Sequence, residues 1–188
     1  YQRLWPLVLK KDQNAKLNFQ NEKGGIRRAC SVASMTGHRG DRVIWDDPNN
    51  VEDAHSDTER ETTIRVFKET LPTRLNNPDV SAILITMQRL HAMDVSGHIL
   101  AEDYGYEHLC LPMEFEVARR CRTSIGFVDP RTEEDELLFP ARFPRHVVDR
   151  DKKVMGSYAT SGQFQQRPSP LGGGIFKETW WQYFDLLP

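Results

Sequence analysis

The chain has 188 residues, of which 38% are hydrophobic, and its 25 basic and 27 acidic side chains give a formal net charge of −2. This length and composition indicate one ordinary soluble domain with enough apolar surface for a core, and they exclude a protein that attracts nucleic acid through its bulk charge. A nucleic-acid contact would need a local basic cluster, and a solvated surface is the simpler interpretation of such clusters. The two clusters are Arg27 with Arg28, and Arg119, Arg120 and Arg122.

Three cysteines, Cys30, Cys110 and Cys121, are an odd number at wide spacing. This spacing favours neither a disulfide framework nor a zinc site, so we expect reduced, buried thiols. No apolar stretch approaches the roughly 20 residues that span a bilayer, and no signal peptide is recognisable. Because the first residue is Tyr1, we expect the chain to be a piece of a longer protein.

The first predicted element is a hairpin over residues 17–33, where apolar and polar residues alternate around a Gly24-Gly25 turn. A polar loop, "SMTGHRGD", then leads into a strand from Arg42 to Trp45, which ends in Asp46 and Asp47. A helix is expected next, because Ser56 and Glu59 have the spacing of a capping box. Its apolar face holds Ile64, Phe67 and Leu71, and Pro72 stops it.

The run "SAILITM", residues 81–87, is continuous and apolar, which predicts a strand buried on both faces. A short helix is expected after Asp94, and "EHLCLP", residues 107–112, is a third candidate buried strand. Strands that alternate with helices predict an α/β class with a largely parallel sheet. In such sheets ligands gather at the carboxyl ends of the strands, where Asp46, Asp47 and the stretch from Thr86 to His91 fall.

The last third of the chain is predicted to be less regular. The segment "DPRTEEDE", residues 129–136, is expected to be an exposed loop, and a helix is expected over residues 145–158. The Pro/Gly segment "RPSPLGGG" has the composition of a boundary or linker.

An apolar strand that ends in Asp-Asp has the form of a Walker B element. In P-loop NTPases the first acid holds Mg²⁺, usually through water, and the second orients or deprotonates the water that attacks the γ-phosphate. Because side chains alternate along a strand, Asp46 and Asp47 can take these different roles only where the backbone turns, which Pro48 favours. A surface Asp-Asp-Pro turn is the alternative interpretation.

The strand of "LITMQRLHAMD", residues 84–94, brings Thr86 and Gln88 to the sheet edge. These neutral hydrogen-bonding groups could sense the γ-phosphate, or they could simply cap a strand end. Two such strand ends about 40 residues apart, joined by a helix, favour a shared site.

Three segments together resemble the ATPase region of the large terminase subunit of tailed bacteriophages. They are "SMTGHRGDRVIWDDPNN", "TLPTRLNNPDVSAILITMQRLHAMDVSGHIL" and the segment from "LLFPARFPRHVVDRDKKVMG" to "QFQQRPSPLGGGIFKETWW". The resemblance covers residues 18–184 and implies a P-loop NTPase fold of the RecA-like ASCE type, with a mainly parallel sheet flanked by helices. It also implies an ATPase that drives double-stranded DNA into procapsids and carries a C-terminal nuclease.

Carried over by resemblance, Asp46 matches the Walker B aspartate and metal ligand, and Asp47 the catalytic acid, where many members have Glu. The segment "TMQR", residues 86–89, matches the coupling motif, with Thr86 and Gln88 as phosphate-sensing residues. Arg39 is the first candidate for the arginine finger. Arg42 and Arg89 are the alternates, although a structural arginine is the simpler reading of each. His91 and Asp94 are expected to hold the turn after the strand.

The sequence also departs from the family pattern, since it has no GxxxxGK[ST] phosphate loop. We therefore expect that loop upstream of Tyr1 and the nuclease acids downstream of Pro188. Residues 1–176 would be the later part of the ATPase domain, inactive alone, and residues 177–188 the start of a linker.

The resemblance implies Mg²⁺ and ATP as cofactor and substrate. The implied partners are double-stranded DNA, the portal protein, the small terminase subunit and further copies in a ring. The implied location is the host bacterial cytoplasm, without a membrane. Two alternatives stay open: a helicase-like translocase, and a catalytically silent interaction module without a phosphate loop.

Overall fold

The computed structural model describes residues 7–169 and Trp180. The chain divides into two compact units, residues 1–40 and residues 41–188. The boundary expected between residues 176 and 177 lies outside the described residues.

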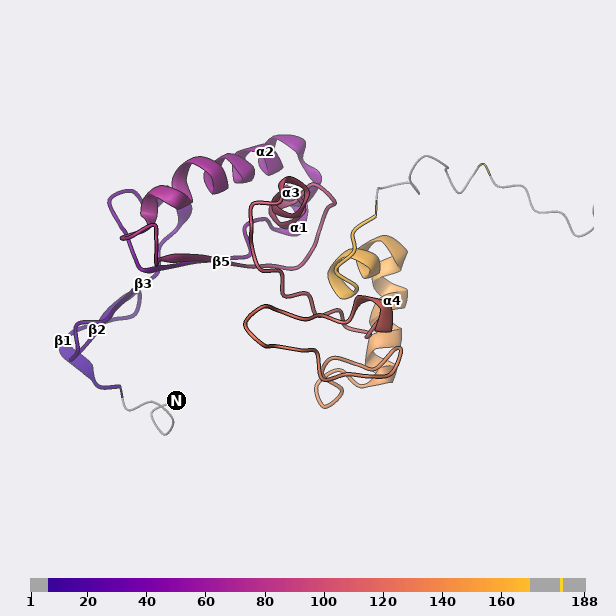
Figure 1. The fold of residues 1–188 in the computed structure, drawn as a ribbon. Helices are drawn as coiled ribbons and strands as arrows, with labels where there is room; N and C mark the ends of the chain where they lie inside the picture. The colour runs from indigo at the N-terminus through magenta and orange to yellow at the C-terminus, as the bar shows by residue number, and fades with distance from the viewer. Residues whose placement is uncertain (1–6, 170–179, 181–188) are drawn as a thin grey trace, which may run out of the picture. The chain divides into compact units, whose positions relative to one another are not determined.

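The first unit is a three-stranded antiparallel sheet in the order β1 (Leu9–Ala15), β2 (Asn18–Asn21), β3 (Ile26–Arg28), followed by a short 3₁₀ helix over Val32–Ser34 (Figure 1). The predicted hairpin is confirmed as β2 and β3. Its turn places Gly24 at φ +85°, a left-handed conformation that glycine adopts without a steric penalty. Strand β1 was not predicted.

The sheet of the second unit is one parallel pair, β4 (Arg42–Asp46) and β5 (Ala82–Thr86). This pair, with helices between and after its strands, is compatible with the predicted α/β class. The third strand expected at residues 107–112 is wrong, because the described backbone there belongs to no strand. Local contacts hold this segment instead, since the Cys110 amide lies 3.4 Å from Cys121 Sγ and the same thiol lies 3.8 Å from the His108 carbonyl.

Helical segments make up much of the rest of the second unit. The helices expected after Ser56 and after Asp94 are present, and the one expected over residues 145–158 is present with a kink at Gly156, where φ is +73°. They are α1 (Val51–His55), α2 (Asp57–Arg65), α3 (Val95–Glu102) and α4 (Arg145–Ala159). A π-helical turn over Val66–Thr70 and a 3₁₀ turn over Leu71–Arg74 extend α2, another 3₁₀ turn covers Val117–Arg119, and a π-helical turn over Thr160–Phe164 extends α4.

The core of the helices lies among α1, α2 and α3, which Figure 1 shows on one side of the strand pair. Its buried side chains are Ala54, Phe67, Leu71, Val95 and Ile99. The ring of Phe67 also contacts three aromatic rings, with centroid distances of 5.8 to 6.5 Å: those of His98, Tyr104 and Tyr106.

Burial of β5 on both faces is a wrong prediction. Along both strands, exposed and half-buried residues alternate, so one face of the pair is open. Ile44 is 66% exposed and Leu84 is 57% exposed on that face. The physical reason is that no described residue covers this face of the two-stranded sheet.

The loop predicted to be exposed at residues 129–136 is only partly so. Asp129 and Arg131 are 1% and 4% exposed and form an ion pair of 2.8 Å. Arg131 also donates to the Pro112 carbonyl at 2.8 Å and lies 5.2 Å from the centre of the Phe115 ring. The two charged side chains can be buried because the guanidinium and the carboxylate pair with each other. The pattern of apolar and polar residues along the sequence gives no sign of this pairing.

All three cysteines are free thiols, as predicted, but only Cys121 is buried. Cys110 is half-buried and Cys30 is exposed. Among the described residues, no helix has both the length and the apolar character needed to cross a bilayer.

Candidate functional site

The carboxyl ends of β4 and β5 lie side by side. Asp46 and Thr86 are direct register partners, and the amide of Asp47 donates to the Thr86 carbonyl at 2.8 Å. Partners in register point to the same face of a sheet, so the Asp46 carboxylate and the Thr86 hydroxyl share the open face. Both residues are exposed, as is Asp47.

The backbone turns at Asp47, where φ is +44°. Strand β4 ends one residue earlier, so the two neighbouring carboxylates are no longer bound by strand alternation. Aspartate and asparagine tolerate this left-handed conformation better than most residues, because their short side chains can bond the local backbone. The turn expected between the two acids is therefore present, and its geometry favours Asp over the longer Glu.

The loop after the acids is anchored by Asn49, a residue that the sequence did not single out. Asn49 is 4% exposed, and its Nδ2 donates to Thr63 Oγ1 on α2 at 2.8 Å. Its Oδ1 is buried without a partner among the described groups. The next residue, Asn50, caps α1 by accepting from the Asp53 amide at 2.8 Å. Two asparagines before a helix were the available signal, since Asn is a favoured N-cap.

The segment that leaves β5 is organised by Asp94, which is fully buried. Its carboxylate accepts from Arg89 Nε at 2.9 and 3.0 Å and from the amides of Leu90, His91 and Gly97. The amide of Met93 donates to His91 Nδ1 at 3.1 Å. Asp94 and His91 thus hold the turn after the strand, as expected.

The same segment is packed against the turn that follows α4. The Arg89 amide donates to Gln166 Oε1 at 3.0 Å, and the Tyr158 hydroxyl donates to the Leu90 carbonyl at 3.5 Å. Gly162 lies so close that a Cβ built on it would be 2.7 Å from the Arg89 carbonyl oxygen. The exit of β5 is therefore in contact with the "QFQQR" segment, whose partners the sequence did not predict.

Gln88, the second candidate sensor, is exposed and lines a groove of about 470 Å³ together with Gln163 and Gln166. The groove also contains apolar side chains of α4, among them Val154 and Met155. The structure thus places Gln88 two residues beyond the end of β5, beside the turn after α4.

The surroundings of His91, in the segment after β5, favour its neutral form. Burial lowers the pKa of His91, and the nearby charge of Arg60 lowers it further. Arg60 is itself 8% exposed and donates to the Ala54 carbonyl at 2.6 Å. His91 is thus favoured in its neutral form, with Nδ1 as acceptor.

The three candidate arginines differ in their surroundings. Arg89 is held by Asp94, as described above. Arg42 begins β4, about 13 Å along the strand from Asp46, and donates to the carbonyls of Asp41 and Val80 at 2.7 and 3.0 Å. Arg39 is exposed and belongs to the first unit. Bonds within the second unit thus occupy two of the three side chains.

The carboxylates at the strand ends, those of Asp46 and Asp47, are not part of a larger cluster of metal-binding side chains among the described residues. Among residues 7–169 and Trp180, no group of three or more His, Cys, Asp or Glu side chains is arranged to hold a metal. Mg²⁺ is usually bound by one or two carboxylates, with waters and substrate phosphates completing its shell. Asp46 and Asp47 meet that requirement, and Asp46 would be the ligand by its position at the strand end.

Comparison with known proteins adds no relative: no model of a known protein family matches this sequence, and no curated protein matches it either.

Proposed function

We propose that this chain is part of the ATP-hydrolysing motor of a bacteriophage large terminase, which drives double-stranded DNA into procapsids. The observation that supports the proposal is the register of β4 and β5, which joins Asp46, Asp47 and Thr86 at one edge. In such a motor the strand end that carries the acids must lie next to the strand end that senses the γ-phosphate. Here Asp46 and Thr86 are adjacent, although 40 residues separate them in the sequence.

Each residue has a role in the proposal. Asp46 would hold Mg²⁺, which supplies charge for the β- and γ-phosphate oxygens, and Asp47 would orient the attacking water. Both carboxylates are exposed, so a phosphate cradle supplied from outside these residues could reach them. The hydrogen bond from the Asp47 amide to Thr86 links the acid directly to the strand that would sense the γ-phosphate.

The wider setting is also part of the proposal. The fold would be a RecA-like P-loop NTPase. The motor would act as a ring of copies in the bacterial cytoplasm, with the portal protein and the small terminase subunit as partners. Arg39 is the arginine proposed to act on a neighbouring subunit, because Arg42 and Arg89 already have bonding partners.

The test is a pair of substitutions in the complete subunit. Asp46→Ala should abolish Mg²⁺-dependent ATP hydrolysis, because the metal loses its ligand. Asp47→Asn should keep nucleotide binding while stopping turnover, and asparagine tolerates the left-handed backbone at this position, so folding should be preserved. Steady-state ATPase and nucleotide-binding assays measure both.

The matched control is Asp79→Asn, which removes one exposed carboxylate near the opposite end of β5. It should hydrolyse ATP at the parent rate. If Asp47→Asn also retains the parent rate, the catalytic assignment of Asp47 is wrong.

A helicase-like translocase would use the same two strand ends, and helicase motifs instead of a nuclease downstream would favour it. A silent interaction module would not bind nucleotide even when extended upstream. The chain of 188 residues should bind ATP poorly, because carboxylates without a cradle repel a polyanion. Micromolar affinity measured by calorimetry would contradict a phosphate loop outside these residues.

A further inference from the structure

Charge is distributed very unevenly between the two units. Residues 1–40 contain eight Lys and Arg but only two acidic side chains, a formal charge of +6. Residues 41–188 then carry −8, which together give the net −2 of the whole chain. The first unit is therefore strongly basic although the net charge of the whole chain is close to zero. Basic side chains concentrated on one element are typical of a surface that contacts a polyanion.

Most of this positive charge lies on the three-stranded sheet, hereafter the basic sheet, residues 9–28. Its basic side chains are Lys10, Lys11, Lys16, Lys23, Arg27 and Arg28, and its acidic ones are Asp12 and Glu22. No residue of the sheet with a described side chain is buried. A small sheet normally buries one face, so an exposed, charged sheet is suited to an external partner.

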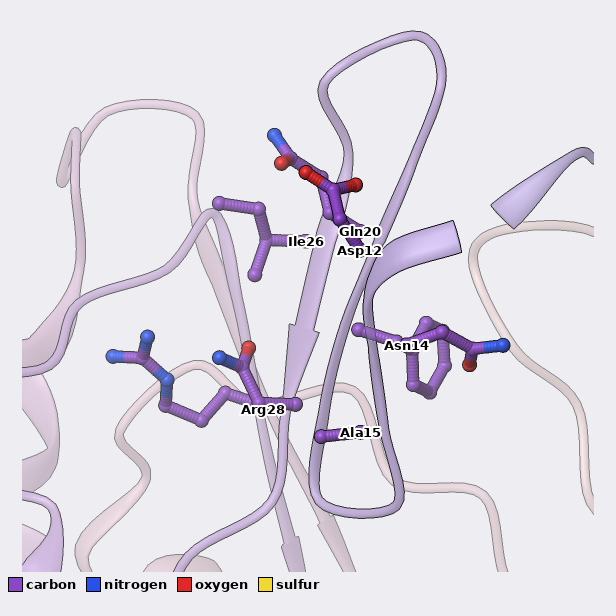
Figure 2. A pocket seen from close by; sticks show the side chains of 8 residues that line it. Asp12, Asn14, Ala15, Gln20, Ile26 and Arg28 are labelled. Carbon is purple, nitrogen blue, oxygen red and sulfur yellow. The ribbon is translucent and has the colours of Figure 1, made fainter. Parts of the chain in front are cut away.

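One part of the basic sheet is shaped as a pocket of about 280 Å³ (Figure 2). Antiparallel register sets Asn18 opposite Arg28 and Gln20 opposite Ile26. Arg28 is held in place by His38, with Nη1 at 2.7 Å from the ring Nδ1. In Figure 2 Asp12 and Gln20 lie at one end of the pocket and Arg28 at the other, so the Arg28 guanidinium supplies positive charge away from the Asp12 carboxylate.

A second contact feature is the pair of Arg27 and Phe19, which are also register partners. The Arg27 guanidinium lies 5.8 Å from the centre of the half-buried Phe19 ring. An arginine held over an aromatic ring loses little further side-chain entropy when it binds a phosphate. The sheet thus offers lysines, positioned arginines and amide side chains, which are the groups that contact nucleic-acid backbones.

Two of the three side chains in the other arginine cluster, Arg119 and Arg120, are not free in this way. Arg119 pairs with Glu116 at 3.1 Å and donates to the Gln165 carbonyl, and Arg120 donates to the Asp129 carbonyl at 2.9 Å. These side chains hold the fold of the second unit together. The structure therefore separates two clusters that looked alike in the sequence.

We propose that the basic sheet binds the phosphate backbone of duplex DNA without reading its sequence. It would be the surface through which the motor proposed above holds its duplex. Because its test uses no nucleotide, either proposal can fail without the other.

The test uses the 188-residue chain and a fluorescent mixed-sequence duplex, with binding followed by anisotropy across about 50 to 200 mM salt. The triple variant Lys11→Gln, Lys16→Gln and Lys23→Gln removes exposed lysines whose side chains make no hydrogen bond or ion pair with another described residue, so the fold should persist. Each phosphate contact contributes about 0.9 to the slope of the logarithm of the binding constant against the logarithm of the salt concentration. The magnitude of this salt slope should therefore fall by up to about 2.7 in the triple variant. Affinity at the lowest salt should fall at least tenfold.

The matched control makes the same change of charge in the second unit: Arg65→Gln, Lys68→Gln and Lys153→Gln, all at exposed positions. Its slope and affinity should stay at the parent values. A second duplex of unrelated sequence should bind equally well.

Three results would overturn the proposal. One is a parent chain that does not bind duplex DNA at low salt. Another is an equal loss of affinity in both triple variants, which would mean that only net charge matters. The third is full binding by the Lys11, Lys16 and Lys23 variant, which would mean that the basic sheet faces an acidic protein surface or an anionic membrane instead.

Discussion

Replacing Asp94 by alanine should be the most damaging single change near the candidate site. The carboxylate is completely buried and accepts from the Arg89 side chain and from three backbone amides. Removing one partner of a buried ion pair costs about 3 to 5 kcal/mol, because the other charge is left without compensation. The Arg89 side chain is 13% exposed, so water can partly solvate its charge once the carboxylate is removed. We therefore expect a loss of stability in the lower part of that range.

The N-cap bond from Gly97 at 2.8 Å is lost as well, but its cost of about 1 kcal/mol overlaps with the first loss and does not simply add. Urea unfolding, followed by tryptophan fluorescence, measures the change. With a slope near 3 kcal/mol/M, the upper end of the range for small proteins, the midpoint should fall by about 1 M or more. Asp94→Asn should lie between the parent and alanine, because it keeps an acceptor for the amides but loses the charge.

The matched control is Asp79→Ala, which removes an exposed carboxylate before β5. Its free energy of unfolding should stay within about 0.5 kcal/mol of the parent value. If Asp94→Ala shifts the midpoint no more than Asp79→Ala does, the Asp94 network does not stabilise the exit of β5 and the reasoning is refuted.

Three further outcomes are expected. Gly162→Ala should lower the free energy of unfolding by about 1 to 3 kcal/mol, because the new Cβ would press on the Arg89 carbonyl. Urea unfolding measures this, with Ser157→Ala at an exposed position as the control. Equal unfolding midpoints for the two variants would contradict the contact. Burial opposes ionisation of Glu114, but hydrogen bonds from Lys152 (2.7 Å) and Arg145 outweigh it and lower the pKa. The stability that this carboxylate contributes is therefore present above about pH 4.5 and is lost as the pH falls. The Glu114→Gln variant should unfold more easily than the parent at pH 7, but it should lose less stability than the parent on acidification. Parallel plots of stability against pH for the two proteins would contradict this. Thr86→Val in the complete subunit should lower packaged DNA per ATP hydrolysed, whereas equal losses of packaging and hydrolysis would remove the coupling role.

Several elements could be predicted from the sequence because a few neighbouring residues determine them. The hairpin follows from a glycine that supplies a positive φ, and α3 begins where Asp94 can accept the Gly97 amide. The helix after Ser56 starts with the predicted cap, since Ser56 Oγ accepts the Glu59 amide at 3.4 Å. The acidic pair and Thr86 could likewise be placed at strand ends, because each follows directly on an apolar run that ends there.

Other features depended on residues far apart, and local patterns carry no information about them. The register that pairs Asp46 with Thr86 and the bond from Arg89 to Gln166, 77 residues away, both require the assembled second unit. An apolar run alone also could not show that Leu84 would be open to solvent, because burial depends on what covers a face.

Charged residues give the clearest division between the two kinds of information. Sequence composition determined the basic excess of residues 1–40, because charge is a property of the residues themselves. Only the tertiary structure decided that Arg131 is buried against Asp129 while Lys11 stays in solvent, because a charge can leave water only where the fold supplies a partner.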